Sequence, residues 1–219
     1  VKKFVHISTD EVYGSVASGK SKEVDILDPT SPYSSSKAAA DLIALSYHKT
    51  FGLPVMITRS SNNFGPYQHP EKFIPLFITN AIEGKKLPLY GDGKNIRNWI
   101  YVEDNCAAVD AVLRKGKPGG IYNIGGRVEV KNRAIADAVI KALKADPGLL
   151  VFVKDRPAHD RRYALDSSKA EKLGWRCKYD FKEALAKTVK WYSDNREWWE
   201  RLKCGMFKSY YKKLYGRRG

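Results

Sequence analysis

The sequence has no long apolar run, since none approaches the roughly eighteen consecutive apolar residues of a membrane-spanning helix. It also has no charged start followed by an apolar core and a cleavage site, which is the pattern of a secretory signal. Cysteine is scarce, and the three residues Cys106, Cys177 and Cys204 are odd in number and widely spaced. This excludes a disulfide framework and indicates reduced thiols. These absences predict a cytoplasmic protein without a membrane partner.

Two kinds of hydrolase motif are missing. The four histidines, at positions 6, 48, 69 and 159, show no His-Glu-x-x-His motif or other paired-ligand spacing, so we expect no metal site. There is also no Gly-x-Ser-x-Gly elbow, which disfavours a serine hydrolase.

Acidic residues are outnumbered, with 24 Asp and Glu against 39 Lys and Arg and a formal net charge of +15. Such a field attracts phosphate groups on nucleic acid, on a membrane surface or on a small substrate. Residues 203–219 contain no acid and carry Lys203, Lys208, Lys212, Lys213, Arg217 and Arg218. A solvated surface is the ordinary interpretation of such a segment. A nucleic-acid binder is a minor alternative that a salt-dependent DNA affinity would support, but no recognised motif favours it, and we expect no nucleic-acid partner.

Short β-rich runs alternate with longer helical patterns. The strands are predicted at 3–8, 55–60, 87–90 and 120–124, and the helices at 32–51, 72–83, 103–114, 132–144, 167–173 and 181–202. The first helix has clear boundaries, because Ser31 can cap it, Pro32 suits its first position and Gly52 can end it. Alternation of this kind predicts an α/β fold with a largely parallel sheet.

Tyr33 and Lys37 are four residues apart at the start of that helix and therefore share one face. At roughly 5.5 Å and an effective dielectric of about 20, the ammonium would lower the phenol pKa by about two units. The phenol would then approach usefulness as a general base. A surface pair is the alternative interpretation.

Thr9, Asp10 and Glu11 follow the first predicted strand directly. Ligands of open α/β sheets bind at the carboxyl ends of the strands. Adjacent carboxylates repel, which raises one pKa and leaves one acid and one base. A turn or cap role for Asp10 is the alternative.

Together these motifs resemble the extended short-chain dehydrogenase/reductase family. The resemblance rests on Ser8-Thr9, Val12-Tyr-Gly14, Tyr33-x-x-x-Lys37, Arg59-Ser-Ser-Asn62, Phe64-Gly-Pro66 and Tyr101-Val-Glu-Asp104. A finer match to the family's sugar-nucleotide dehydratases lies in Thr9-Asp-Glu11, residues 62–72, Asn95-Ile-Arg97, Tyr122-Asn-Ile-Gly-Gly126 and residues 156–163. The resemblance covers essentially the whole chain, in order.

The resemblance implies a Rossmann-like, doubly wound parallel sheet and a smaller C-terminal α/β substrate-binding lobe. Residues 1–64 are expected to form the later part of the NAD-binding domain with the catalytic residues, and residues 65–219 mainly the substrate lobe, interleaved with the last Rossmann elements. The implied protein is a cytoplasmic lyase of deoxysugar biosynthesis that removes water from a nucleotide-diphosphate sugar, uses NAD as cofactor and forms a homodimer.

The resemblance also implies a role for each candidate residue. Tyr33 takes the proton of the sugar 4-hydroxyl and Thr9 hydrogen-bonds that hydroxyl, while Glu11 removes the C5 proton and Asp10 protonates the departing 6-hydroxyl. Lys37 contacts the nicotinamide ribose and completes the catalytic set. The implied cofactor-binding residues are Ser8, Tyr33, Lys37, Ser60 and Asn63. The implied substrate-binding residues are Thr9, Asn62, Glu71, Lys72, Pro88, Tyr90, Arg97, Asn132 and His159. Without the resemblance, a surface salt bridge is the alternative for Arg97 and a structural hydrogen bond the alternative for His159.

One part of the family pattern is missing. The family's Gly-rich turn, which holds the cofactor pyrophosphate at a helix N-terminus, has no counterpart, because Asn123-Ile-Gly-Gly126 and Gly91-Asp-Gly93 lack its spacing and setting. We therefore expect an N-terminally truncated form with an exposed sheet edge. The nearest alternative function is a 4-epimerase of the same family, which has no need of Asp10 and Glu11.

Overall fold

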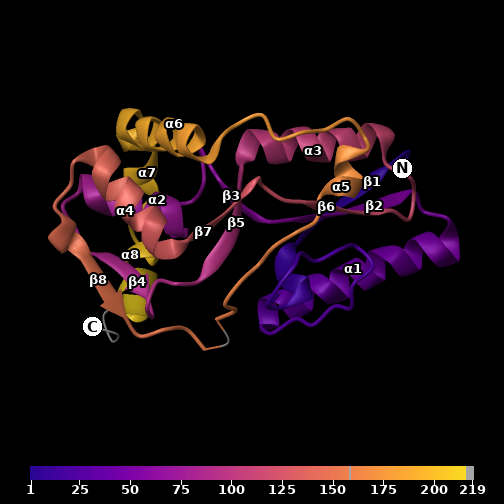
Figure 1. Ribbon diagram of the computed structural model, residues 1–219, viewed down its shortest axis with the longest axis horizontal. Coiled ribbons are helices and arrows are strands. Elements are labelled where there is room, and N and C mark those ends of the chain that lie inside the picture. Colours follow the sequence, from indigo (N-terminus) through magenta and orange to yellow (C-terminus); the bar gives the residue numbers. More distant parts are fainter. Residues whose placement is uncertain (158, 216–219) are drawn as a thin grey trace. The chain divides into compact units, whose positions relative to one another are not determined.

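The computed structural model describes residues 1–157 and 159–215 (Figure 1). The chain divides into two compact units. The first unit contains Val1–Asn63, Ile96–Glu129 and Asp160–Phe181, and the second contains Phe64–Asn95, Val130–His159 and Lys182–Gly219. No helix in the described ranges is long and apolar enough to cross a membrane.

The first unit is built on a parallel sheet with strand order β1-β2-β6. β1 (Phe4–Thr9) pairs with β2 (Val55–Ser60) from Phe4 opposite Val55 to Thr9 opposite Ser60, and β2 pairs with β6 (Ile121–Ile124). Every residue of the central strand β2 is buried. Because all three strands run in the same direction, their carboxyl ends lie along one edge.

Helices cover both faces of this sheet (Figure 1). α1 (Pro32–Phe51) packs against β1 and β2, while α3 (Val102–Lys115) packs against all three strands from the other face. Met56, Ile100, Val112, Tyr122 and Trp175 belong to the core on the α3 side, which α5 (Ser168–Glu171) completes. The predicted α/β fold with helices on both sides of a parallel sheet is confirmed.

α1 begins and ends where the sequence predicts. Ser31 and Ser34 form a reciprocal capping box, Pro32 occupies the first turn, and Gly52 ends the helix at φ 67° with its N–H bonded to the His48 and Tyr47 carbonyls. The left-handed conformation at Gly52 is one that glycine adopts without steric cost.

The apolar stripe of α1 is not the face that packs on the sheet. Leu42, Ile43 and Tyr47 are 60%, 59% and 51% exposed. The buried positions are instead Ser34, Ala38 and Asp41. A polar residue is tolerated on the packed face because Arg59 of β2 neutralises Asp41.

Three short strands were absent from the prediction and form a second sheet in the order β3-β5-β7. They are β3 (Asn62–Phe64), β5 (Ile96–Tyr101) and β7 (Val128–Lys131). β5 reads Ile-Arg-Asn-Trp-Ile-Tyr and is buried over almost its full length, so it does not show the alternation that identifies a half-buried strand.

In the second unit β4 (Leu87–Tyr90) pairs in parallel with β8 (Leu150–Val153), a strand that the sequence did not predict. α2 (Phe73–Ile82) packs against β4 and against α4 (Asn132–Leu143). A short 3-10 turn, η2 (Pro147–Leu149), leads into β8.

The prediction of a single helix over residues 181–202 is wrong. It is divided at Asn195 into α6 (Phe181–Asp194) and α7 (Arg196–Leu202). At this junction Asn195 has a non-helical backbone (φ −115°, ψ 44°), and both its backbone N–H and its side-chain amide donate to the Trp191 carbonyl. A further helix, α8 (Met206–Tyr215), lies in the segment predicted as a solvated basic surface.

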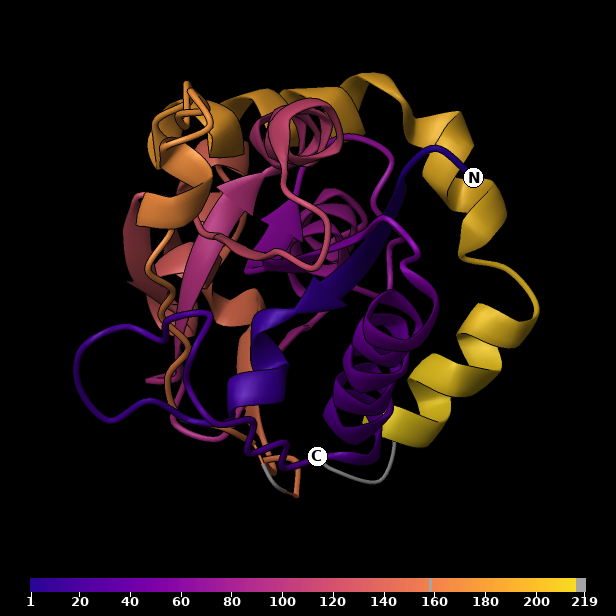
Figure 2. The same ribbon diagram turned by 90° about the vertical axis from the view of Figure 1, so that its right-hand side faces the viewer.

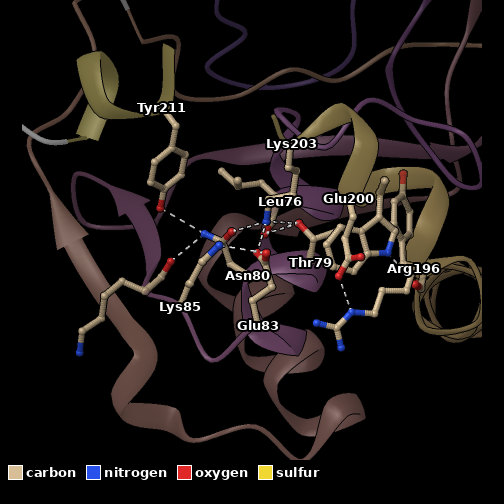
Figure 3. A network of polar contacts seen from close by, with 12 residues as sticks. Leu76, Thr79, Asn80, Glu83, Lys85, Arg196, Glu200, Lys203 and Tyr211 are labelled. Atoms are coloured by element: carbon tan, nitrogen blue, oxygen red, sulfur yellow. Dashed lines mark hydrogen bonds and ion pairs between the residues drawn. The ribbon is translucent and has the colours of Figure 1, made fainter. Parts of the chain in front are cut away.

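Lys203, in that segment, departs from the prediction because it is only 7% exposed. Figure 3 shows its side chain within a network of polar contacts. Its ammonium donates to Thr79 Oγ1 at 3.1 Å, to Asn80 Oδ1 at 3.0 Å and to Glu83 Oε2. Asn80 in turn donates to Tyr211 Oη at 3.2 Å. Burial lowers the pKa of Lys203, and the Glu83 carboxylate opposes that shift. The three donors of the ammonium are thus used to fasten the C-terminal helices to α2. Arg217 and Arg218, also counted in the basic segment, lie outside the described residues.

Candidate functional site

A sharp turn at the end of β1 presents the two candidate carboxylates. Thr9 caps the short 3-10 helix η1 (Asp10–Tyr13), with its hydroxyl accepting from the Glu11 N–H at 3.3 Å. Gly14 ends η1 at φ 70°, and a Cβ there would lie 2.4 Å from the Asp28 carbonyl oxygen. A larger residue at position 14 would push this turn apart, so glycine is needed to place Asp10 and Glu11 at the carboxyl edge of the sheet.

Asp10 is buried, with 3% of its surface exposed. Its pKa is raised to about 7, chiefly by burial and next by the neighbouring Glu11 charge, while Arg97 acts in the opposite direction. The repulsion between adjacent carboxylates expected from the sequence therefore contributes, but burial contributes more. Asp10 can hold a proton near neutral pH, as a general acid must. Asp10 is also the first residue of η1, which agrees with the turn interpretation.

The phenol and ammonium pair lies on α1, which packs against β1 and η1. Figure 2 shows β1 leading into η1 with α1 beside them. Lys37 Nζ donates to the Ile7 carbonyl at 2.5 Å, so the ammonium reaches the last residues of β1. Tyr33 is one turn earlier on the same face and is 55% exposed. The structure thus brings Lys37 to the strand that carries Ser8 and Thr9.

Several buried oxygens gather at the carboxyl ends of β1 and β2. Among the described residues, Ser8 Oγ, Ser61 Oγ and Asn62 Oδ1 are buried without a hydrogen-bond partner. Such atoms are costly unless a ligand or water satisfies them. Ser60 differs, since its hydroxyl donates to Asn105 of α3 at 2.8 Å, and Asn63 donates its amide to the Ser61 carbonyl at 3.0 Å.

Arg97 is a buried residue and does not lie on the surface. Its guanidinium donates to the Ile96 and Asp160 carbonyls, both at 2.8 Å, and lies 4.3 Å from the centre of the Tyr163 ring. Its charge also acts on Asp10. Arg97 is thus held by contacts within the first unit, where its charge acts on Asp10.

The second unit brings Tyr90 and His159 together, with ring centres 6.2 Å apart. His159 Nδ1 lies 2.6 Å from Asp155 Oδ1, which fixes the ring orientation and directs Nε2 away from that carboxylate. Pro88 is buried two residues before Tyr90 on β4. Asp155, the partner of His159, was not among the predicted residues, although its position four residues earlier is a detectable spacing.

The remaining candidates of the second unit lie at the starts of helices. Glu71 and Lys72 form an ion pair of 3.1 Å just before α2. Asn132 is the first residue of α4, and its backbone N–H donates to the Asn95 carbonyl at 3.0 Å. Its side-chain oxygen is buried without a partner within the described residues, so it too suits a polar ligand.

A Tyr-x-x-x-Lys pair on a helix beside the carboxyl ends of parallel strands, with helices on both faces of the sheet, defines the short-chain dehydrogenase/reductase class. Residues 1–188 match the family described as GDP-mannose 4,6 dehydratase, and the chain belongs to this family. The predicted resemblance to the extended branch of the class is thereby confirmed.

Individual proteins similar to this chain are also dehydratases. The dTDP-glucose 4,6-dehydratase of Streptomyces antibioticus is 53% identical over 204 residues, which cover 93% of this chain and 61% of the relative. The solved structure of the Streptomyces venezuelae dTDP-glucose 4,6-dehydratase with NAD and TYD bound is 52% identical, with a TM-score of 0.91, and the match covers 93% of this chain and 63% of that one. The chain thus spans about three fifths of the length of the curated relatives it matches.

Epimerases match less closely. The solved Thermus thermophilus UDP-glucose 4-epimerase in complex with NAD is 30% identical, with a TM-score of 0.84 over 89% of this chain and 65% of that one. The fold is shared between the two activities, so the side chains at the carboxyl edge must distinguish them.

Proposed function

We propose that the protein is a sugar-nucleotide 4,6-dehydratase that converts dTDP-glucose into dTDP-4-keto-6-deoxyglucose and water. The observation that carries the proposal is the pair Asp10 and Glu11, in which burial raises the pKa of one carboxyl to about 7 beside a second carboxylate. Elimination of water next to a ketone needs one acid and one base, and two carboxyl groups in different environments provide them. The similarity to dTDP-glucose 4,6-dehydratases supports the same choice.

Each residue then has a defined task. Tyr33 accepts the proton of the sugar 4-hydroxyl, and Thr9 hydrogen-bonds that hydroxyl. Glu11 removes the proton at C5, which the neighbouring C4 ketone has made acidic, and Asp10 gives its proton to the 6-hydroxyl, which leaves as water. Lys37 places a positive charge one turn from Tyr33 and favours the ionised phenol.

The residues at the carboxyl edge fit the nicotinamide end of NAD. The unpartnered Ser8 hydroxyl and the Lys37 ammonium at the end of β1 are the polar groups that such a ligand would satisfy. In the proposed site Tyr33, Lys37, Ser8, Ser60 and Asn63 hold the cofactor. NAD, when bound, supplies the reversible oxidation of the sugar at C4 and the reduction at C6.

The substrate nucleotide is proposed to bind mainly through the second unit. Lys72 and His159 offer positive or hydrogen-bonding groups to the diphosphate, and the ring of Tyr90 offers a face to the base. The other proposed contacts are Glu71, Pro88 and Asn132 of the second unit, and Asn62 and Arg97 of the first. No nucleic-acid or membrane partner is part of the proposal.

Incubation of the complete gene product with dTDP-glucose and NAD tests the function. We expect a nucleotide sugar that has lost one water and carries a ketone, detected by mass spectrometry, with no net consumption of NAD. Formation of dTDP-galactose without loss of water would instead identify a 4-epimerase. A protein that binds both ligands and forms neither product would contradict the whole assignment.

We also propose a cytoplasmic homodimer that pairs through the exposed stripe of α1. Leu42, Ile43 and Tyr47 are each more than half exposed, and an apolar stripe of this kind on a surface helix favours association. Ile43→Asp is expected to halve the mass measured by light scattering, whereas Leu113→Asp on α3 should leave it unchanged. A wild-type mass of one chain would contradict the proposal.

A further inference from the structure

A buried polar network links the two halves of the proposed catalytic set. Arg59 of β2 donates through Nε to Asp41 Oδ2 at 2.8 Å and through Nη1 to Tyr13 Oη at 2.7 Å. The Tyr13 hydroxyl donates onward to Asn123 Oδ1 on β6 at 2.8 Å. All four side chains are buried.

The ends of this network lie on the elements that carry the proposed chemistry. Tyr13 is the last residue of η1, whose first two residues are Asp10 and Glu11. Asp41 is on α1, four residues after Lys37, so it continues the helix face of Lys37 and of Tyr33. Arg59 therefore joins the segment of the two carboxyl groups to the helix of the phenol and ammonium.

The bonding pattern requires each particular side chain. Arginine alone among the basic residues offers several donors in a planar fork, and here two of them serve acceptors on two different elements. Burial raises the pKa of Tyr13, so the hydroxyl stays protonated and can accept from Arg59 while it donates to Asn123. Asn123 is itself fixed, because its amide donates to the Ser21 carbonyl at 3.0 Å.

The buried Arg59–Asp41 pair does not by itself indicate a stabilising role. Replacing a buried ion pair by apolar side chains of similar volume is often neutral or stabilising, so a buried pair is weak evidence for a stabilising role. A buried pair that connects two elements carrying catalytic groups can instead hold those groups at the right distance. This matters because small displacements of catalytic groups reduce the reaction rate by large factors.

We propose that Tyr13, Arg59 and Asp41 are positioning residues that set the place of Asp10 and Glu11 relative to Tyr33 and Lys37. None of the three touches the reacting atoms in this proposal, which rests on the proposed function. Their effect is on the turnover step and not on nucleotide binding, because most of the proposed nucleotide contacts lie in the second unit.

Tyr13→Phe tests the proposal, because it removes one hydroxyl and keeps the ring. In the complete gene product we expect kcat to fall about 100-fold, the scale expected for a displacement of about 1 Å in a catalytic group, with KM for dTDP-glucose unchanged. Tyr122→Phe is the matched control, since Tyr122 is a buried residue of β6 in the same sheet and its hydroxyl also takes part in a 2.8 Å hydrogen bond, as acceptor from the Lys117 N–H. The control should retain the wild-type kcat. Equal loss in both variants, or a raised KM with kcat intact, would overturn the proposal.

Arg59→Lys gives a second test, because lysine keeps the charge opposite Asp41 but cannot hold both acceptors in the same geometry. The double variant of Tyr13→Phe and Arg59→Lys should lose no more activity than the more affected single variant. Additive losses would show that the two residues act separately.

Amide hydrogen exchange tests the positioning role without measuring enzyme activity. The Glu11 and Gly14 N–H groups, bonded within η1, should exchange faster in Tyr13→Phe and not in Tyr122→Phe. If the wild-type protein makes no product, the proposed function fails, and the exchange result still decides whether this network holds η1. Unchanged exchange in Tyr13→Phe would refute the positioning role.

Discussion

Replacing Glu11 by Gln is expected to reduce the rate of water loss by about 10³-fold, within the range found when a general base is removed. Glutamine has nearly the same shape but cannot take a proton at neutral pH. The turn itself should survive, because the Glu11 backbone makes the bonds that shape η1: its N–H donates to Thr9 Oγ1 and its carbonyl accepts from Gly14. The loss would therefore come from the missing base.

The step that fails can be identified directly. In Glu11→Gln the reduced nicotinamide absorbance should still appear after dTDP-glucose is added, because Tyr33 and Lys37 are intact. Exchange of the C5 proton with deuterated solvent, followed by NMR, should stop. Glu103→Gln is the matched control, since Glu103 is an acid of the same unit that accepts from Tyr179 Oη on the surface of α3. A Glu11→Gln protein that still loses water at the wild-type rate would exclude Glu11 as the base of the elimination.

The sequence predicts best where a local pattern decides the structure. Ser31, Pro32 and Gly52 fix the ends of α1 through the capping box, the proline ring and a left-handed glycine, all of which act within a few residues. The order Thr9-Asp10-Glu11 after a strand likewise predicts carboxyl groups at the sheet edge. The burial of Asp10 could not be read from the sequence, because it depends on the packing around η1, and this burial dominates the pKa.

Contacts between residues far apart in the sequence were the main features that the sequence did not predict. Asp41 and Arg59 are 18 positions apart, and Lys203 lies more than 100 residues from Glu83. A charge run such as 203–219 is normally solvated, and nothing local shows that one member is buried against α2. β5 was not recognised for a different reason. A strand that is buried on both sides carries no period-two signal in its sequence.

Asp10→Asn should stabilise the protein at alkaline pH. Because the folded pKa is about 7 against the ordinary aspartate value of 3.8, the fold favours the neutral acid, chiefly through burial. The stability of the neutral form is fully present below pH 4 and is lost as the pH rises through about 7. A difference of about three pKa units corresponds to about 4 kcal/mol. Asparagine is neutral at every pH and avoids this loss.

Urea unfolding at pH 4 and at pH 8 measures the effect. The free energy of unfolding of Asp10→Asn should exceed that of the wild type by up to about 4 kcal/mol at pH 8 and differ little at pH 4. Asp110→Asn is the control, because its partner Arg114 lowers the Asp110 pKa, so no alkaline gain is expected there. A wild-type advantage at pH 8 would show that Asp10 is stabilised as the anion.

The same ionisation governs the proposed chemistry. Asp10 must hold a proton to release the 6-hydroxyl as water, so the rate of dehydration should fall as the pH rises through about 7. The Asp10 carboxyl therefore lowers the stability of the fold when it is charged and acts as the proposed acid when it is neutral. Asp10→Asn should be more stable than the wild type at pH 8 but should lose turnover at every pH. A stabilised variant that still dehydrates dTDP-glucose would assign the acid to another residue.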